Sequence, residues 1–163
     1  MKIKLMFLSM TLLFITTGCY AEITGTVVDA ETGEPIEGAV VLVEWTVTKG
    51  IGLTYHESYK VIEAVTDKEG KVTISGVLNP FVNYPHVTVY KKGYVAWNNE
   101  FIFPNYKHRE DFKYKNGITI RLELFKNEYS ISDHVFFLHS VTHWGKLINE
   151  AYRWEELEKE GQK

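Results

Sequence analysis

The sequence predicts a mainly β protein, in which a seven-stranded β-sandwich is followed by a C-terminal amphipathic helix. Between residues 23 and 125, short apolar or alternating runs are separated by turns rich in Gly, Pro, Asn and Asp, which is the pattern of an all-β domain. Beyond residue 127, apolar residues recur three and four apart, the period of a helix. Of the 163 residues, 45% are hydrophobic and 14% aromatic, which is enough to build a packed core.

The opening stretch of the domain, residues 23–43, predicts a strand, a turn and a second strand. Residues 23–28 alternate with a period of two. Residues 29–38 carry turn chemistry, because a Thr-Gly pair gives a flexible tip and Pro35 presets φ. Residues 39–43 form a continuous apolar run, which is typical of a strand buried on both faces. We therefore expect an opening hairpin.

The middle of the domain predicts two more strands and a loop. Residues 56–64 alternate as a strand, and residues 71–74 form the returning strand. Between them, the turn at 67–70 has Gly70 at the position that needs a positive φ, which predicts a second hairpin. Residues 77–85 hold two prolines and read as a loop, whose apolar side chains we expect to cover one end of the sandwich.

Three further strands complete the predicted sandwich. Residues 86–90 and 94–97 each predict a strand, whereas residues 98–115 are polar, aromatic and irregular. Residues 117–125 (GITIRLELF) alternate cleanly and predict the last strand. We expect four of its side chains to point inward: Ile118, Ile120, Leu122 and Leu124.

The C-terminal segment predicts a helix. It begins with Ser130 and Asp133, residue types that cap helix N-termini. We expect a bend or break near Gly145 and fraying of the charged end at residues 155–163. The helix either packs on the sandwich or presents its aromatic face to a partner or a membrane surface. Its apolar stripe contains Phe137, Val141, Trp144, Ile148 and Ala151.

Three sequence blocks follow one another in a fixed order. Residues 25–41 contain G-x-V-x-D followed by T-G-x-P-I-x-G-A-x-V, residues 66–74 read TDKEGKVTI, and residues 87–94 read VTVYKKGY. Together these blocks resemble the carboxypeptidase regulatory-like domain, a transthyretin-like Greek-key β-sandwich. The resemblance implies this fold for residues 19–126, with residues 127–163 as a helical extension. It implies no peptidase activity, since function resides in sites and not in folds.

The N-terminal segment has the layout of a secretory signal. Lys2 and Lys4 precede an apolar run over residues 5–15, which is too short to span a bilayer as a stable helix. We interpret residues 1–18 as a signal peptide of the lipoprotein type. Removal of Lys2 and Lys4 with this segment changes the net charge from −3 to −5, which argues against a nucleic-acid partner.

Cys19 is the only cysteine and directly follows Gly18, as in a bacterial lipobox. At such a site the cysteine becomes the new N-terminus and carries acyl chains such as palmitate, which tether the protein to a membrane. A lipidated cysteine has a use, whereas one free thiol in an exported protein is an oxidation liability. Thr16 departs from the Leu usual at that place, so cleavage after Ala21 and a free cysteine stay open as alternatives.

These features predict a location in the cell envelope. A lipid anchor at Cys19 makes the membrane the first expected partner, with an envelope protein or a glycan as a further one. Tyr20 stands where inner-membrane lipoproteins of Gram-negative bacteria usually carry Asp. In such a host the resemblance therefore points to the periplasmic side of the outer membrane. Without lipidation, the protein would be secreted or periplasmic.

Two histidine arrangements are candidate metal sites. His139 and His143 are four residues apart and share a helix face, but no Glu follows the first His as in H-E-x-x-H. His108 is followed three residues later by Asp111, where zinc carboxypeptidases carry Glu. We therefore expect no metal, no cofactor and no enzymatic activity. A metal-dependent enzyme that uses His108 or the His139/His143 pair is the least favoured function.

The residues around Trp97 are the best indication of a ligand site. The Trp97 ring can stack on a sugar while Asn98 and Asn99 hydrogen-bond its hydroxyl groups, with Tyr94 nearby. The same residues can equally form rim packing under a loop. The sequence thus predicts a non-catalytic cell-envelope lipoprotein whose β-sandwich serves as a binding or assembly module. The alternative is a secreted carbohydrate- or peptide-binding module.

Overall fold

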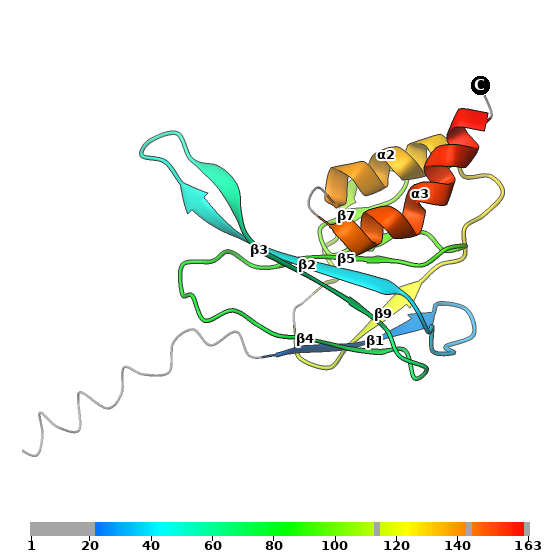
Figure 1. The fold of residues 1–163 in the computed structure, drawn as a ribbon, viewed down its shortest axis with the longest axis horizontal. Coiled ribbons are helices and arrows are strands. Elements are labelled where there is room, and N and C mark those ends of the chain that lie inside the picture. Colours follow the sequence, from blue (N-terminus) through cyan, green and yellow to red (C-terminus); the bar gives the residue numbers. More distant parts are fainter. Residues whose placement is uncertain (1–21, 113–114, 143–144, 162–163) are drawn as a thin grey trace, which may run out of the picture.

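The structure, a computed structural model, describes residues 22–112, 115–142 and 145–161. The expected signal peptide and lipidation site, Cys19, lie outside the described residues, and so does His143. The elements of the described chain, shown in Figure 1, are β1 (Ile23–Asp29), β2 (Val40–Lys49), β3 (Tyr55–Val65), β4 (Lys71–Ile74), β5 (His86–Tyr90), β6 (Trp97–Asn98), β7 (Phe101–Ile102), β8 (Lys107–His108), β9 (Ile118–Leu122), α2 (Ile131–Val141) and α3 (Lys146–Gly161).

Seven of the described strands form the two sheets of a sandwich. One sheet has the order β4-β1-β9, in which β4 is antiparallel and β9 parallel to β1. The other has the order β3-β2-β5-β6 and is antiparallel. Strands β7 and β8 pair separately as a small hairpin within the stretch expected to be irregular. The predicted mainly β, seven-stranded sandwich is confirmed.

Strand β2 is buried on both faces over its first half, as its apolar run predicts. Val41, Val43 and Trp45 belong to the core between the two sheets. Val40 and Leu42 belong to a second core, which lies beneath the helices. Because successive side chains of a strand point to opposite faces, only an unbroken apolar run suits a strand that separates two cores.

Two connections expected to be hairpins instead cross from one sheet to the other. β1 and β2 lie in different sheets, so residues 30–39 form an arch, in which Ile36 N–H donates to Val27 O at 3.0 Å. β3 and β4 also lie in different sheets, joined through residues 66–70. Gly70 has the expected positive φ, 69°, and a Cβ there would lie 2.4 Å from Val27 O. The hairpin prediction was wrong because turn residues reverse the chain without deciding which sheet the next strand joins.

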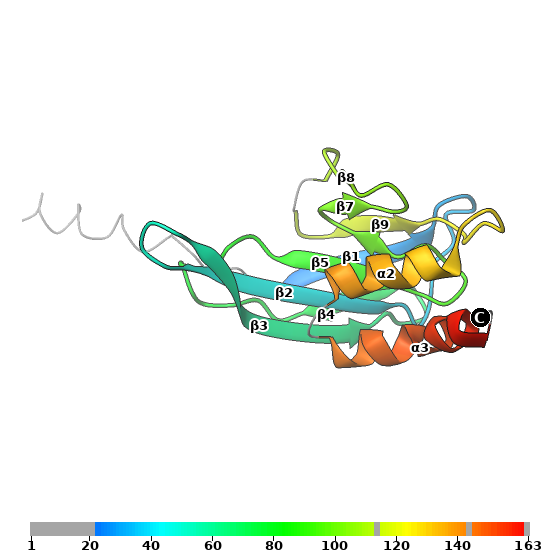
Figure 2. The same ribbon diagram turned by 90° about the horizontal axis from the view of Figure 1, so that it is seen from above.

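Helices α2 and α3 cover the outer face of the β3-β2-β5-β6 sheet (Figures 1 and 2). The expected N-cap is present, since Ser130 Oγ accepts the N–H of Asp133 at 3.2 Å. The expected break near Gly145 is also present, because α2 ends at Val141 and α3 begins at Lys146. Of the two outcomes that the sequence left open, the helical segment packs on the sandwich. The buried residues of this second core are Val40, Leu42, Tyr90, Ala96, Phe103, Phe137, Leu138, Ile148 and Tyr152.

A carboxylate from the sheet caps the N-terminus of α3. Glu63 of β3 accepts the backbone N–H groups of residues 146–148 at 2.8–2.9 Å. The helix itself offers these groups no partner, and negative charge is favourable at this end. Gly145 permits the approach, because a Cβ there would lie 2.2 Å from Leu42 Cδ1 and 2.8 Å from Glu63 Oε1.

Two side chains near the chain's C-terminal part differ from expectation. The last strand ends at Leu122, and Leu124, which was expected to point inward, is 44% exposed. Glu155, which was expected in a fraying end, is buried, because α3 continues to Gly161 and turns this side chain toward the sheet. Among the described helices, none combines the length and the apolar character that crossing a membrane requires.

Strands β2 and β3 run on beyond the sandwich as a two-stranded arm, whose tip is residues 50–54 (Figures 1 and 2). The loop at residues 77–85 lies beside this arm. Its Val77 and Val82 are buried, as expected for a loop that covers one end of the sandwich. Its other apolar side chains are exposed, contrary to expectation: Leu78, Phe81 and Tyr84.

Candidate functional site

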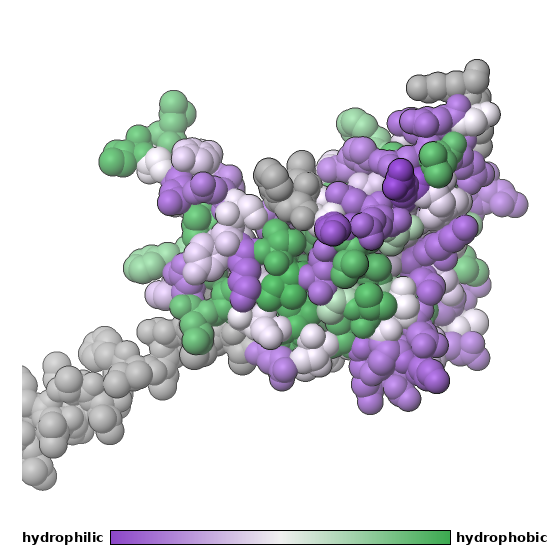
Figure 3. Space-filling model, viewed as in Figure 1, coloured by the Kyte–Doolittle hydropathy of each residue, from purple (hydrophilic) through white to green (hydrophobic). Residues whose placement is uncertain are grey.

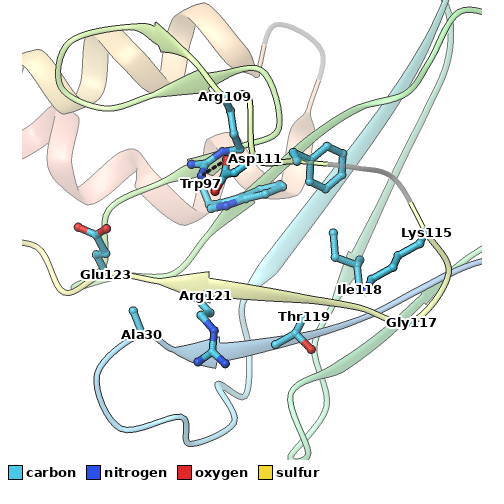
Figure 4. A pocket seen from close by; sticks show the side chains of 11 residues that line it. Ala30, Trp97, Arg109, Asp111, Lys115, Gly117, Ile118, Thr119, Arg121 and Glu123 are labelled. Atoms are coloured by element: carbon cyan, nitrogen blue, oxygen red, sulfur yellow. Dashed lines mark ion pairs between the residues drawn. The ribbon is translucent and has the colours of Figure 1, made fainter.

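A groove of about 700 Å³ lies between β9 and the segment that follows β6 (Figure 4). Its lining residues are Ala30, Trp97, Arg109, Asp111, Phe112, Lys115, Gly117, Ile118, Thr119, Arg121 and Glu123.

One wall of the groove is built on Trp97. The guanidinium carbon of Arg109 lies 4.9 Å from the centre of the Trp97 ring, a cation–π contact, and Phe112 meets the ring edge-on at 5.4 Å. Arg109 is fixed in turn, because its Nε donates to Asn98 O at 2.8 Å and its Nη1 lies 3.6 Å from Asp111 Oδ1. Burial lowers the pKa of Arg109, but a guanidinium stays charged at physiological pH. This wall therefore presents an aromatic ring held beside a fixed cation.

The opposite wall is the outward face of β9. Because alternate residues of this strand point into the core, Thr119 and Arg121 lie on its outward face and line the groove, and in Figure 4 their side chains extend from β9 away from Trp97. The groove holds three cations, Arg109, Lys115 and Arg121, and two carboxylates. Its local charge is therefore positive, in a chain whose net charge is −3. Such a site favours an anionic ligand over a cationic one.

Asn98 and Asn99 brace the backbone and do not line the groove. The Oδ1 of Asn98 accepts the N–H groups of residues 100–101 at 2.8 and 2.9 Å, and its Nδ2 donates to β5. Asn99 accepts the N–H of Val87 at 2.8 Å and donates to the carbonyl of Pro85 at 3.0 Å. Of the two amides and the ring that the sequence grouped together, the structure brings only Trp97 to the groove.

Tyr94 lies at a different edge of the domain, against the first arch. Its hydroxyl donates to Asp29 Oδ2 at 3.1 Å. The Oδ1 of Asp29 accepts the N–H groups of Thr32 and Glu31 at 2.9 and 2.8 Å, and these bonds hold the pKa of Asp29 below its usual value. Burial, and then the hydrogen bond to Asp29, raises the pKa of Tyr94. Tyr94 thus closes a turn and is not part of the groove.

The histidines considered as metal ligands have other neighbours. His139 Nε2 lies 2.7 Å from Glu156 Oε1 on the exposed side of the helices, and its expected partner, His143, is outside the described residues. His108 packs against Phe101, with 4.8 Å between ring centroids. Within residues 22–112, 115–142 and 145–161, no group of three or more His, Cys, Asp and Glu side chains is placed to hold a metal ion.

A buried polar network, which sequence reasoning missed, joins the helices to the sheet. His134 Nδ1 lies 2.7 Å from Glu155 Oε2, and Tyr90 O–H donates to Glu155 Oε1 at 2.7 Å. The N–H of Ala96 donates to His134 Nε2 at 2.9 Å. Since Nε2 accepts, the ring proton is on Nδ1 and is donated to Glu155. Burial, and then Glu155, raises the pKa of Tyr90.

The sequence does contain a signal for this network. Glu155 lies seven residues after Ile148 and three after Tyr152, so it falls on the apolar stripe of α3. A carboxylate at such a position is buried only if it finds partners. Its partners come from a strand and from the other helix, and their arrangement depends on the tertiary structure.

The sequence profile of the carboxypeptidase regulatory-like domain family matches residues 22–108, more than half of the chain. The chain belongs to this family. The match covers β1 to β8, with Trp97 and His108, whereas β9, α2 and α3 lie beyond it. Membership confirms the resemblance seen in the three sequence blocks. A regulatory-like domain is consistent with a module that has no catalytic activity of its own.

Among solved structures, that of the Streptococcal ancillary pilin is similar at 14% identity and a TM-score of 0.36. The alignment covers 66% of this chain and 30% of that chain. A score this low carries nothing about the pilin over to this chain. No match was found among curated proteins.

Proposed function

We propose that this protein is a non-catalytic lipoprotein of the cell envelope, whose β-sandwich is a binding module held at a membrane surface. The observation that carries the proposal is how closely the lipobox-like Cys19 precedes the folded domain, whose first strand begins at Ile23. Two or three acyl chains on that cysteine give stable anchoring. Membership in a regulatory-like domain family supports a role without catalysis.

The ligand site in this proposal is the Trp97 groove. An aromatic ring with a few well-placed polar groups is the usual composition of a small-ligand site. Trp97 supplies apolar lining against which a sugar can pack, and Arg109 and Arg121 offer planar guanidinium groups that match carboxylates. The chemistry therefore favours an acidic glycan of the envelope as the ligand.

The tether is tested by the intact mass of the mature protein isolated from its native host. The expected mass is that of a chain that starts at Cys19 and carries acyl chains. A mass that starts at Glu22 would refute the lipoprotein and favour the alternative, a secreted carbohydrate- or peptide-binding module. The groove would be retained as the ligand site under that alternative.

The groove is tested by titrating the protein with glycans that carry carboxylates and with their neutral analogues. We expect saturable quenching of tryptophan fluorescence by the acidic glycans only, lost in Trp97→Ala and weakened about 10-fold or more in Arg121→Ala. The matched control is Lys126→Ala, which removes a cation outside the groove and leaves the affinity unchanged. Equal binding of acidic and neutral glycans, or of the wild type and Trp97→Ala, would refute this site.

A further inference from the structure

Exposed apolar side chains gather on two neighbouring segments of the described surface. The arm carries Ile51 and Leu53 at its tip, where Leu53 is 92% exposed, and Tyr55 and Tyr59 along its length. The loop beside it carries Leu78 and Phe81 as well, and Phe81 is 82% exposed. Figure 3 shows apolar surface at the tip of the arm, far from the helices. We call this set the apolar end: Ile51, Leu53, Tyr55, Tyr59, Leu78 and Phe81.

The two segments of the apolar end are held together. Asn83, in the loop, donates its backbone N–H to Thr46 O at 2.8 Å and its Nδ2 to Thr46 Oγ1 at 3.0 Å. Val82 pairs with Val47 as a bridge to β2, and Asn83 Nδ2 also lies 3.0 Å from His56 Nδ1 on β3. The loop is therefore attached to the base of the arm, and the exposed side chains of both segments lie toward the same end of the molecule.

The apolar end lies on the side of the sandwich where the folded chain begins. β1 starts at Ile23, which pairs with Ile74, and the loop follows directly after Ile74. In Figure 1 the blue start of β1, the loop and the arm all lie toward the same end, opposite the helices. Four peptide units join Cys19 to Ile23, and an extended chain spans at most about 3.3–3.6 Å per residue, or about 14 Å in all. A cysteine anchored in lipid therefore keeps this end close to the bilayer.

The charge pattern of the apolar end also fits a bilayer surface. No Asp, Glu, Lys or Arg occurs in residues 50–56 or 72–90. Charged side chains that border the arm tip are paired, since Lys49 Nζ lies 3.6 Å from Glu57 Oε2. Aliphatic and Phe side chains gain from entering the acyl boundary, and Tyr rings are favoured at the headgroup level. The tip of the arm carries the aliphatic residues Ile51 and Leu53, and its stem carries Tyr55 and Tyr59.

We propose that the apolar end inserts into the outer part of the lipid bilayer to which the protein is anchored. This inference rests on the proposed lipid anchor. The single tether and the apolar end together fix the orientation of the sandwich. The helices then point away from the membrane, and the Trp97 groove, which opens beside β9, is presented to the side.

The test uses an artificial tether, so its outcome does not depend on whether Cys19 is lipidated. The mature chain from Tyr20, which lacks cysteine, is fused to an N-terminal hexahistidine tag and bound to vesicles that contain nickel-chelating lipid, phosphatidylethanolamine and phosphatidylglycerol. An environment-sensitive dye is attached through Leu53→Cys or, as a matched control, through Leu157→Cys on α3. Both leucines are exposed, so neither change disturbs the core.

The dye at residue 53 is expected to shift to the blue on tethering and to be quenched by nitroxide-labelled lipids, while the dye at 157 does neither. Ile51→Ser with Phe81→Ser should reduce binding of the untagged chain to the same vesicles at least about 10-fold, with unchanged thermal stability. An unshifted dye at 53, or equal shifts at 53 and 157, would overturn the proposal. A shift that depends on protein concentration without vesicles would assign the apolar end to a second copy of the chain and also overturn it.

Discussion

Two Glu–His pairs between α2 and α3 have the same chemistry and opposite exposure, which makes them a matched experiment. His134–Glu155 and His139–Glu156 both have an N–O distance of 2.7 Å. The side chains of the first pair are 0% and 3% exposed, and those of the second are 55% and 38% exposed. We consider Glu155→Gln, which keeps the shape of the side chain and removes its negative charge.

The expected loss can be worked out from the hydrogen bonds. Glu155 accepts from Tyr90 and from His134, and bonds to a charged group contribute about 1.5–3 kcal/mol each, or about 3–6 kcal/mol together. Gln has one acceptor oxygen, so it restores one neutral bond of about 0.5–1.5 kcal/mol and leaves one buried donor unpaired. The expected decrease in the free energy of unfolding is therefore about 2–5 kcal/mol. For Glu156→Gln it is about 0–1 kcal/mol, because an exposed pair is screened by solvent.

The measurement is urea unfolding of the wild type and the two variants, followed by far-UV circular dichroism. The slopes with urea should agree among the three proteins, so that the midpoints report stability alone. Losses of stability that are equal within about 0.5 kcal/mol for Glu155→Gln and Glu156→Gln would show that burial does not strengthen this pair. The role assigned to the network would then be refuted.

Three further predictions concern the capping carboxylate, the tight glycine and a surface ion pair. Glu63→Ala should destabilise the protein by about 1–2 kcal/mol in urea unfolding, because three N–H groups of α3 lose their acceptor; a neutral change would contradict the cap. Gly145→Ala should cost about 1–3 kcal/mol through overpacking, whereas Gly161→Ala, with open space around it, should be neutral; equal effects would count against the close contact. Glu100 raises the pKa of His86 above 6.5, and His86 lowers the pKa of Glu100 below 4.5. The stabilisation is thus complete between these values and fades as the pH rises through the His86 pKa or falls through the Glu100 pKa. An NMR titration should find that Glu100→Gln returns the His86 pKa toward 6.5, and an unchanged pKa would exclude the pair as its cause.

Local pattern was enough to predict most strands of the sandwich and the helical break, but it did not predict the small β7–β8 hairpin or the connections. The apolar run at 39–43 correctly indicated a strand with two buried faces, since polar residues on either face would have had no partner. The turn signal at Gly70 was also correct, because a positive φ is a local requirement. Which sheet β2 and β4 join depends on contacts distant in sequence, and a turn motif contains no information about them.

For the candidate site, the sequence suggested the aromatic ring of Trp97 but gave no information about the residues that surround it. Trp97 was identified by its residue type, and the groove around it depends on Arg109 and on the exposed face of β9. Asn98 and Asn99 were expected to contact a ligand, whereas in the structure their Oδ1 atoms accept backbone N–H groups and neither residue lines the groove. Asn is common both at sugar sites and as a backbone brace, so its type alone does not separate the two roles.

Because β2 contributes side chains to two cores, the segment that must fold together is not the same as the segment that matches the family. The family match ends at residue 108, but Val40 and Leu42 are shielded from water only while α2 and α3, which follow that residue, are packed on the sheet. A fragment cut after the last strand would expose one whole face of a sheet to water and invite edge or face association. The segment that can be transferred to another protein as a folded unit is therefore longer than the segment that matches the family, residues 22–108. Any fusion or truncation of this protein should keep residues 22–161 together.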